Sequence, residues 1–226
     1  MTTLDPLAVV LLVGWGTLVA LDLVSVPQAM LSRPLVAGTV AGWIVGDVEA
    51  GLRVGIVLEL FALDVLPIGA VRYPDYGPAT VVGVALAAGA PWELELGLSV
   101  GLALVLASLG GWSLQVVRRR NARAIQRHAA ALAAGESNAI RWLQYAGLAR
   151  DGARGALLTG LGLAAACALA RWLPINRETA VGFTLVAVGS GLAAAANGAV
   201  RSAGRGARLK WLAAGALAGT LVAVLR

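Results

Sequence analysis

Apolar stretches of roughly 20 residues recur along the chain and limit its possible folds more than any other feature. They lie near 7–26, 97–117, 151–173, 179–200 and 208–225. Roughly 20 apolar residues cross a bilayer core of about 30 Å. Hydrophobic residues make up 59% of the chain and charged residues only 13%, whereas soluble domains carry about 25% charged residues. The sequence therefore predicts an all-α integral membrane protein, a multi-pass helical bundle.

Charge is distributed unevenly along the chain. Eight of the 18 basic residues fall between Arg118 and Arg154, and four more lie in the segment RSAGRGARLK. Basic residues beside membrane spans stay on the cytoplasmic side, so we expect both stretches inside the cell, where they contact anionic lipid and no nucleic acid. Glu93 and Glu95 lie at the other end of one span and are expected outside.

The segment 118–150 has the composition of a cytoplasmic helix. Arginine dominates its first half and alanine is frequent throughout, which favours helix. A basic amphipathic helix usually lies on the membrane surface. Docking of a soluble partner is the alternative interpretation.

Residues 34–91 do not divide into simple spans. PLVAGTVAGWIVGD, GLRVGIVLELFALDVLPIG and GPATVVGVALAAGAP are each apolar but too short to cross straight through, and glycine and proline separate them. This pattern predicts broken or re-entrant helices, which are tolerated inside protein or along a water-filled cavity. Transporters build substrate sites from such segments, so this half is predicted to hold the site.

Two carboxylates in this region are the first candidate ligand contacts. Glu59 lies in the apolar run VGIVLELFAL, and a carboxylate in hydrocarbon needs a cavity or a partner. It could accept hydrogen bonds from two hydroxyls of a polyol, or pair structurally with Arg53 or Arg72. Asp75 follows Pro74 and could bind the ligand or cap the next helix.

Asp22 and Gln28 are the next candidates. Asp22 lies within the first apolar run, and Gln28 follows directly after Pro27. The amide of Gln28 can both donate and accept, as a sugar contact requires. The structural alternative is a hydrogen bond to the backbone loosened around Pro27.

Metal and disulfide chemistry find little support in the sequence. Cys167 is the single cysteine and His128 the single histidine, so a disulfide framework and a multi-cysteine metal site are excluded. We expect no metal, no cofactor and no catalytic residue in this chain.

A dense set of motifs lies between Arg33 and Asp75. This stretch resembles the IIC component of the mannose/fructose/sorbose family of the bacterial phosphotransferase system. The matching elements are Arg33-Pro34-Leu35, Ala37-Gly38-Thr39, Gly46-Asp47, Gly51-Leu52, Gly55, Leu58-Glu59, Pro67-Ile68-Gly69-Ala70 and Pro74-Asp75. The resemblance extends over most of the chain, but the specific motifs lie only in the first third.

The resemblance implies a sugar permease subunit of the bacterial inner membrane, which pairs with a IID membrane subunit to bind and translocate a hexose. Soluble IIA and IIB components would supply the phosphate, and the IIC–IID units would form a homo-oligomer. By resemblance, the sugar contacts fall in the broken region, with Glu59 and Asp75 first and Gln28 and Asp22 next. The resemblance also implies elevator-like movement of a core against a scaffold.

We expect one membrane domain over 1–226, with a substrate-site half (1–117), a basic segment (118–150) and C-terminal spans (151–226). Two other functions stay open: a regulatory or degenerate IIC-like subunit without transport, and a proton-coupled secondary transporter. Pairing of Glu59 and Asp75 with Arg53 and Arg72, in place of an open polar cavity, would favour the regulatory alternative.

Overall fold

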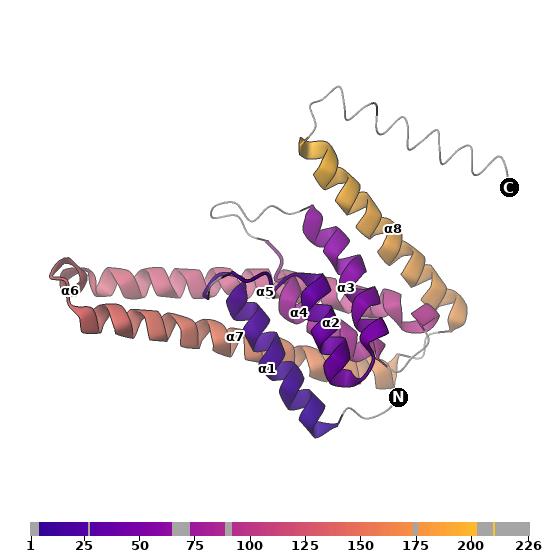
Figure 1. Ribbon diagram of the computed structural model, residues 1–226, viewed down its shortest axis with the longest axis horizontal. Coiled ribbons are helices and arrows are strands. Elements are labelled where there is room, and N and C mark those ends of the chain that lie inside the picture. The colour runs from indigo at the N-terminus through magenta and orange to yellow at the C-terminus, as the bar shows by residue number, and fades with distance from the viewer. Residues whose placement is uncertain are drawn as a thin grey trace.

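A computed structural model of the chain describes residues 5–26, 28–64, 73–88, 92–173, 176–202 and 210. Every regular element in these ranges is an α-helix (Figure 1). The all-helical membrane fold predicted from the sequence is therefore confirmed. The helices are α1 (Pro6–Asp22), α2 (Pro34–Val45), α3 (Val48–Leu63), α4 (Tyr76–Ala87), α5 (Trp92–Arg127), α6 (Ala129–Ala133), α7 (Ser137–Trp172) and α8 (Arg177–Ser202).

Three helices of the described ranges, α5, α7 and α8, are long and apolar enough to cross a membrane. They correspond to the spans predicted near 97–117, 151–173 and 179–200. The span predicted over 7–26 forms the shorter apolar helix α1, which is not among these three. Its 17 residues make a helix of about 25 Å, less than the bilayer core of about 30 Å. The span predicted near 208–225 lies outside the described residues, as does Arg72.

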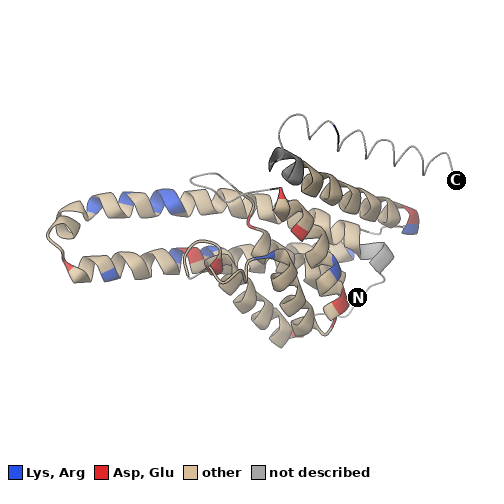
Figure 2. Ribbon diagram, turned by 45° about the horizontal axis from the view of Figure 1, so that its top comes forward, with Lys and Arg blue, Asp and Glu red and all other residues tan. Residues whose placement is uncertain are grey.

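The basic segment is helical, but it does not form a separate surface helix. Helices α5 and α7 contain 36 residues each, which gives each a length of about 54 Å, well beyond the bilayer core of about 30 Å. The C-terminal end of α5 and the N-terminal end of α7 extend side by side as two helical rods, and α6 connects their tips (Figure 1). Figure 2 shows arginines along both rods. We call residues 118–150 the basic arms.

Helices α2 and α3 form a short, tightly packed hairpin. With 12 and 16 residues they reach about 18 and 24 Å, which agrees with the prediction of segments too short to cross directly. Gly46 ends α2 in the left-handed conformation at φ 79°, and Asp47 accepts a hydrogen bond from the Ala50 amide at 2.9 Å. A Cβ on Gly51 would lie 2.4 Å from the Gly38 carbonyl oxygen, so only glycine permits this close approach.

Helix α4 is the centre of the structure. Its residues from Gly77 to Ala87 are all buried, and it packs against α1, α2, α3, α5 and α7. The segment that enters it, Tyr73 to Asp75, lies in a notch on α5. A Cβ on Gly110 would meet the Cβ of Asp75 at 2.7 Å, and a Cβ on Gly111 would meet the Tyr73 carbonyl oxygen at 2.4 Å.

Candidate functional site

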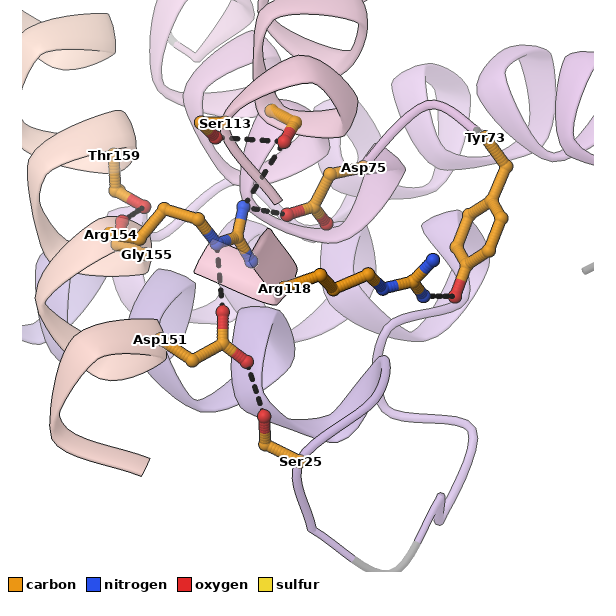
Figure 3. A network of polar contacts seen from close by, with 10 residues as sticks. Ser25, Tyr73, Asp75, Ser113, Arg118, Asp151, Arg154, Gly155 and Thr159 are labelled. Carbon is orange, nitrogen blue, oxygen red and sulfur yellow. Dashed lines mark hydrogen bonds and ion pairs between the residues drawn. The ribbon is translucent and has the colours of Figure 1, made fainter. Parts of the chain in front are cut away.

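A buried network of charged groups connects α7 to three other parts of the fold. Arg154 Nη1 lies 2.6 Å from Asp75 Oδ2, and Arg154 Nε lies 2.8 Å from Asp151 Oδ1 (Figure 3). The Ser25 hydroxyl donates to Asp151 Oδ2 at 2.5 Å. Arg154 Nη1 also donates to the Gly110 carbonyl at 3.4 Å. The network thus joins the loop after α1, the entry to α4, α5 and α7.

The network is almost closed to solvent. The side chains of Asp75, Asp151 and Arg154 are 0%, 2% and 5% exposed. Two carboxylates face one guanidinium, and Asp75 Oδ1 and Arg154 Nη2 make no hydrogen bond within the described residues. A buried charge without its partner is strongly destabilising, so each member of this network depends on the others.

A polar cavity of about 410 Å³ opens beside the network. This volume lies within the range of about 300–1,000 Å³ that is usual for small-molecule sites. A hydroxyl, two amides, a phenol, a carboxylate and a guanidinium face it, which is a set of both donors and acceptors. The lining residues are Val24, Ser25, Gln28, Tyr73, Leu114, Val117, Arg118, Asn121 and Asp151.

The cavity lies at the end of the membrane-crossing parts of α5 and α7, where the basic arms begin. The part of α5 before Arg118 contains 26 residues and the part of α7 from Asp151 contains 22, so both match the bilayer core in length. Arg118 and Asp151 therefore stand where the crossings end and the basic arms begin. By the positive-inside rule this end is predicted to face the cytoplasm.

Arg118 and Tyr73 form one wall of the cavity. The guanidinium donates to the Tyr73 hydroxyl at 3.3 Å and its carbon lies 5.6 Å from the centre of the phenol ring, a cation–π geometry. Figure 3 shows this pair beside the Arg154 network. The contact fixes the Arg118 side chain over the entry to α4.

The structure places Asp22 at the last position of α1 and Gln28 in the loop that follows. Gln28 is exposed, lines the cavity, and donates from Nε2 to the Leu23 carbonyl at 3.2 Å. Asp22 is 1% exposed and accepts from the amides of Ala29 at 2.7 Å and Ser32 at 2.9 Å. Asp22 thus holds the loop after α1 in place, and Gln28 is presented to the cavity.

Asp75 stands behind the cavity and not in its lining. It occupies the position before α4, but its side chain makes no capping hydrogen bond, so the capping alternative is wrong. Its carboxylate binds Arg154, and its amide donates to the Ala107 carbonyl at 2.8 Å. Asp75 is connected to the cavity through Arg154 and Asp151.

Glu59 lies apart from the described cavity and fastens the start of α2. Its carboxylate forms an ion pair with Arg33 and accepts from the Leu35 amide at 3.2 Å. Arg53 pairs instead with Glu49 at 3.1 Å, so Arg53 is not the partner of Glu59. A direct contact of Glu59 with a sugar stays a prediction.

Several cavity and network residues are not among the candidates from the sequence: Ser25, Tyr73, Arg118, Asn121, Asp151 and Arg154. The sequence pattern presents Arg118 and Arg154 only as markers of topology, yet Arg154 is buried. A signal was present, because Asp151 and Arg154 are three positions apart at the start of an apolar helical run, where they share one face. In the described part of the chain, no three acidic, histidine or cysteine side chains gather as a metal site.

The long apolar helices define the class of an integral membrane protein, with a buried charge network and a polar cavity where the crossing helices meet the basic arms. The family profile described as "PTS system sorbose-specific iic component" matches residues 6–195. The chain therefore belongs to this family of phosphotransferase-system IIC membrane components, as the sequence motifs predicted.

Among curated proteins, the sorbose-specific EIIC component of Lacticaseibacillus casei is 31% identical over 147 residues, which are 64% of this chain and 51% of the relative. The mannose-specific EIIC component of Escherichia coli K12 is 35% identical over 118 residues, 51% of this chain and 43% of the relative. The matched regions thus span about half the length of these relatives.

Two solved structures share the fold. One, described as the structure of a membrane protein, has a TM-score of 0.75 at 23% identity. A chain of the mannose transporter ManYZ in complex with microcin E492 has a TM-score of 0.64 at 21% identity. In each comparison 99% of this chain and 96% of the other are covered.

Proposed function

We propose that this chain is the sugar-translocating IIC subunit of a mannose/fructose/sorbose-type phosphotransferase system in the bacterial inner membrane. It binds a hexose and moves it across the membrane together with a IID subunit, and soluble IIA and IIB components deliver the phosphate. Family membership and the names of the curated relatives support this assignment. The solved chain of a mannose transporter supports the fold.

The observation that carries the proposal is the polar cavity. A hexose is neutral and rich in hydroxyls, so it is bound by side chains that donate and accept hydrogen bonds. The cavity offers Gln28, Asn121 and the Tyr73 hydroxyl along its wall, with Asp151 held in place by Arg154. Its position at the cytoplasmic end of the crossing gives a phosphate donor access to the bound sugar.

One observation favours the regulatory alternative. Glu59 and Asp75, the carboxylates predicted to bind sugar, are both paired with arginines, Arg33 and Arg154. Arg53 pairs with Glu49 instead, and Arg72 lies outside the described residues. A subunit with a degenerate site would show the same pairing. Sugar binding separates the two functions, because only the transport subunit needs it.

Substitution of Gln28 by alanine is expected to weaken hexose binding roughly 3- to 10-fold, the effect of one lost hydrogen bond. The measurement is calorimetric titration of mannose, fructose and sorbose into the full chain purified from its native membrane. Gln126→Ala is the matched control, because Gln126 is exposed on the basic arms and lines neither described cavity. Equal hexose affinities of the two variants would show that the sugar does not bind in this cavity.

Purification of the tagged chain from its native membrane tests the partners. The expected result is recovery of a IID-like subunit, with a IIB-like protein bound more loosely. Recovery of the chain with a kinase or regulator and without IID, together with absent hexose binding, would support the regulatory alternative. Uptake that requires a pH gradient but no phosphoryl donor would support the proton-coupled one.

A further inference from the structure

A second cavity adjoins the first between the basic arms. It has a volume of about 280 Å³ and shares Ser25 and Asn121 with the first cavity. It extends along α5 and α7 away from the membrane-crossing part. The lining residues are Ser25, Asn121, Ala124, Ile125, Leu143, Gln144, Gly147, Leu148 and Arg150.

Two guanidinium groups border the shared wall. Arg118 lines the first cavity and Arg150 the second, and Arg150 Nη1 donates to Asn121 Oδ1 at 2.9 Å. Within the described residues, neither arginine forms an ion pair with a carboxylate. The one carboxylate in either lining, Asp151, is already bound by Arg154 and Ser25. Arg154 is shared by Asp75 and Asp151, so their network has one excess negative charge. Two arginines against this one charge leave the junction of the two cavities with a net positive charge.

We propose that this junction, between Arg118 and Arg150, is a binding site for a phosphate group. Phosphate oxygens accept strong, charge-assisted hydrogen bonds from guanidinium groups. The side-chain amide nitrogen of Asn121, whose oxygen accepts from Arg150, adds a neutral donor. The half-buried position of both arginines reduces competition from water. A phosphate here would neutralise the charge that the described residues leave unpaired.

Two sources of phosphate suit this position. A phosphorylated hexose could keep its ring in the first cavity and its phosphate at the junction; this source rests on the proposed function. The headgroup of an anionic phospholipid is the other, because basic pockets between helices at the cytoplasmic side bind such headgroups. The chemistry at Arg118 and Arg150 is the same for both.

The test titrates the full chain, purified in detergent, with inorganic phosphate, mannose 6-phosphate and mannose, and measures its thermal midpoint in nanodiscs with and without phosphatidylglycerol. Arg150→Gln is expected to weaken binding of the phosphate-bearing probe roughly 10- to 100-fold, the effect of a lost charge-assisted hydrogen bond. Arg150→Lys keeps the charge and should restore part of the affinity. Arg141→Gln is the matched control on the same helix, because Arg141 is exposed and lines neither cavity.

Each outcome has a defined meaning. Loss of mannose 6-phosphate binding in Arg150→Gln, with Arg141→Gln unchanged, supports the site with the phosphosugar as its source. Arg150-dependent stabilisation by phosphatidylglycerol alone supports the site with a lipid source. If phosphate binding depends on Arg150 but mannose does not bind, the phosphate site is supported and the proposed sugar-binding function is contradicted. If Arg150→Gln and Arg141→Gln bind every phosphate probe as the unmodified chain does, the proposal is overturned.

Discussion

Replacement of Arg154 by methionine is expected to lower the free energy of unfolding by about 3–5 kcal/mol, the usual effect of breaking a buried ion pair on one side. The substitution leaves Asp75 and Asp151 as two buried carboxylates without a cation, since Arg154 forms the ion pair with each of them. Denaturant unfolding of the purified chain in detergent, followed by circular dichroism, measures the loss.

Two further variants make this expectation specific. Arg141→Met removes an exposed arginine from the same helix and should change stability by less than about 0.5 kcal/mol. The triple variant Asp75→Asn, Asp151→Asn, Arg154→Met removes all three charges and should recover part of the stability, because neutral groups avoid the penalty of an unpaired charge. If Arg154→Met is as stable as Arg141→Met, the network does not hold the helices together.

Replacement of Gly51 by alanine is expected to destabilise the protein by about 1–3 kcal/mol, the range for overpacking. The new Cβ would lie 2.4 Å from the Gly38 carbonyl oxygen and 2.9 Å from the Gly42 Cα. Both are backbone atoms, so α2 and α3 must separate to make room. Helix propensity acts in the opposite direction, because alanine in a helix is about 1 kcal/mol better than glycine.

Gly14→Ala provides the matched control for Gly51→Ala. Gly14 lies in the middle of α1 and is exposed, and a Cβ added there would have no atom within 4 Å. Helix propensity alone then determines the change in stability, so Gly14→Ala should be as stable as the unmodified chain or slightly more stable. Thermal unfolding of both variants in the same detergent gives the comparison, and a stabilised Gly51→Ala would contradict the close packing of the α2–α3 hairpin.

Much of the fold could be predicted because it depends on local sequence. The apolar runs locate α5, α7 and α8, and proline and glycine mark the limits of the shorter helices α2, α3 and α4. The family motif also has a structural basis, since Arg33 at its start pairs with Glu59 in its second half. These features depend on residue spacing and turn chemistry, which a sequence displays directly.

The candidate site could be predicted only in part, because it forms between distant segments. Asp75 and Arg154 are 79 positions apart, and Ser25 and Asp151 are 126 apart. An arginine near the end of a membrane span is usually explained by the positive-inside rule. For this reason the sequence alone does not suggest that Arg154 is buried in an ion-pair network. Gln28 could be found because an amide beside Pro27 stands out in an apolar setting, although its contact with sugar stays a prediction.

The continuity of α5 and α7 has a mechanical consequence. Each helix runs without interruption from the membrane-crossing part, past the cavity, into the basic arms. The arm of α7 extends 14 residues beyond Asp151, about 21 Å at the helical rise. We expect an unbroken helix of this kind to act as a rigid lever, so that a sideways force on α6 moves Arg118 and Asp151. Contact at the tip of the arms is therefore expected to change the shape of the cavity.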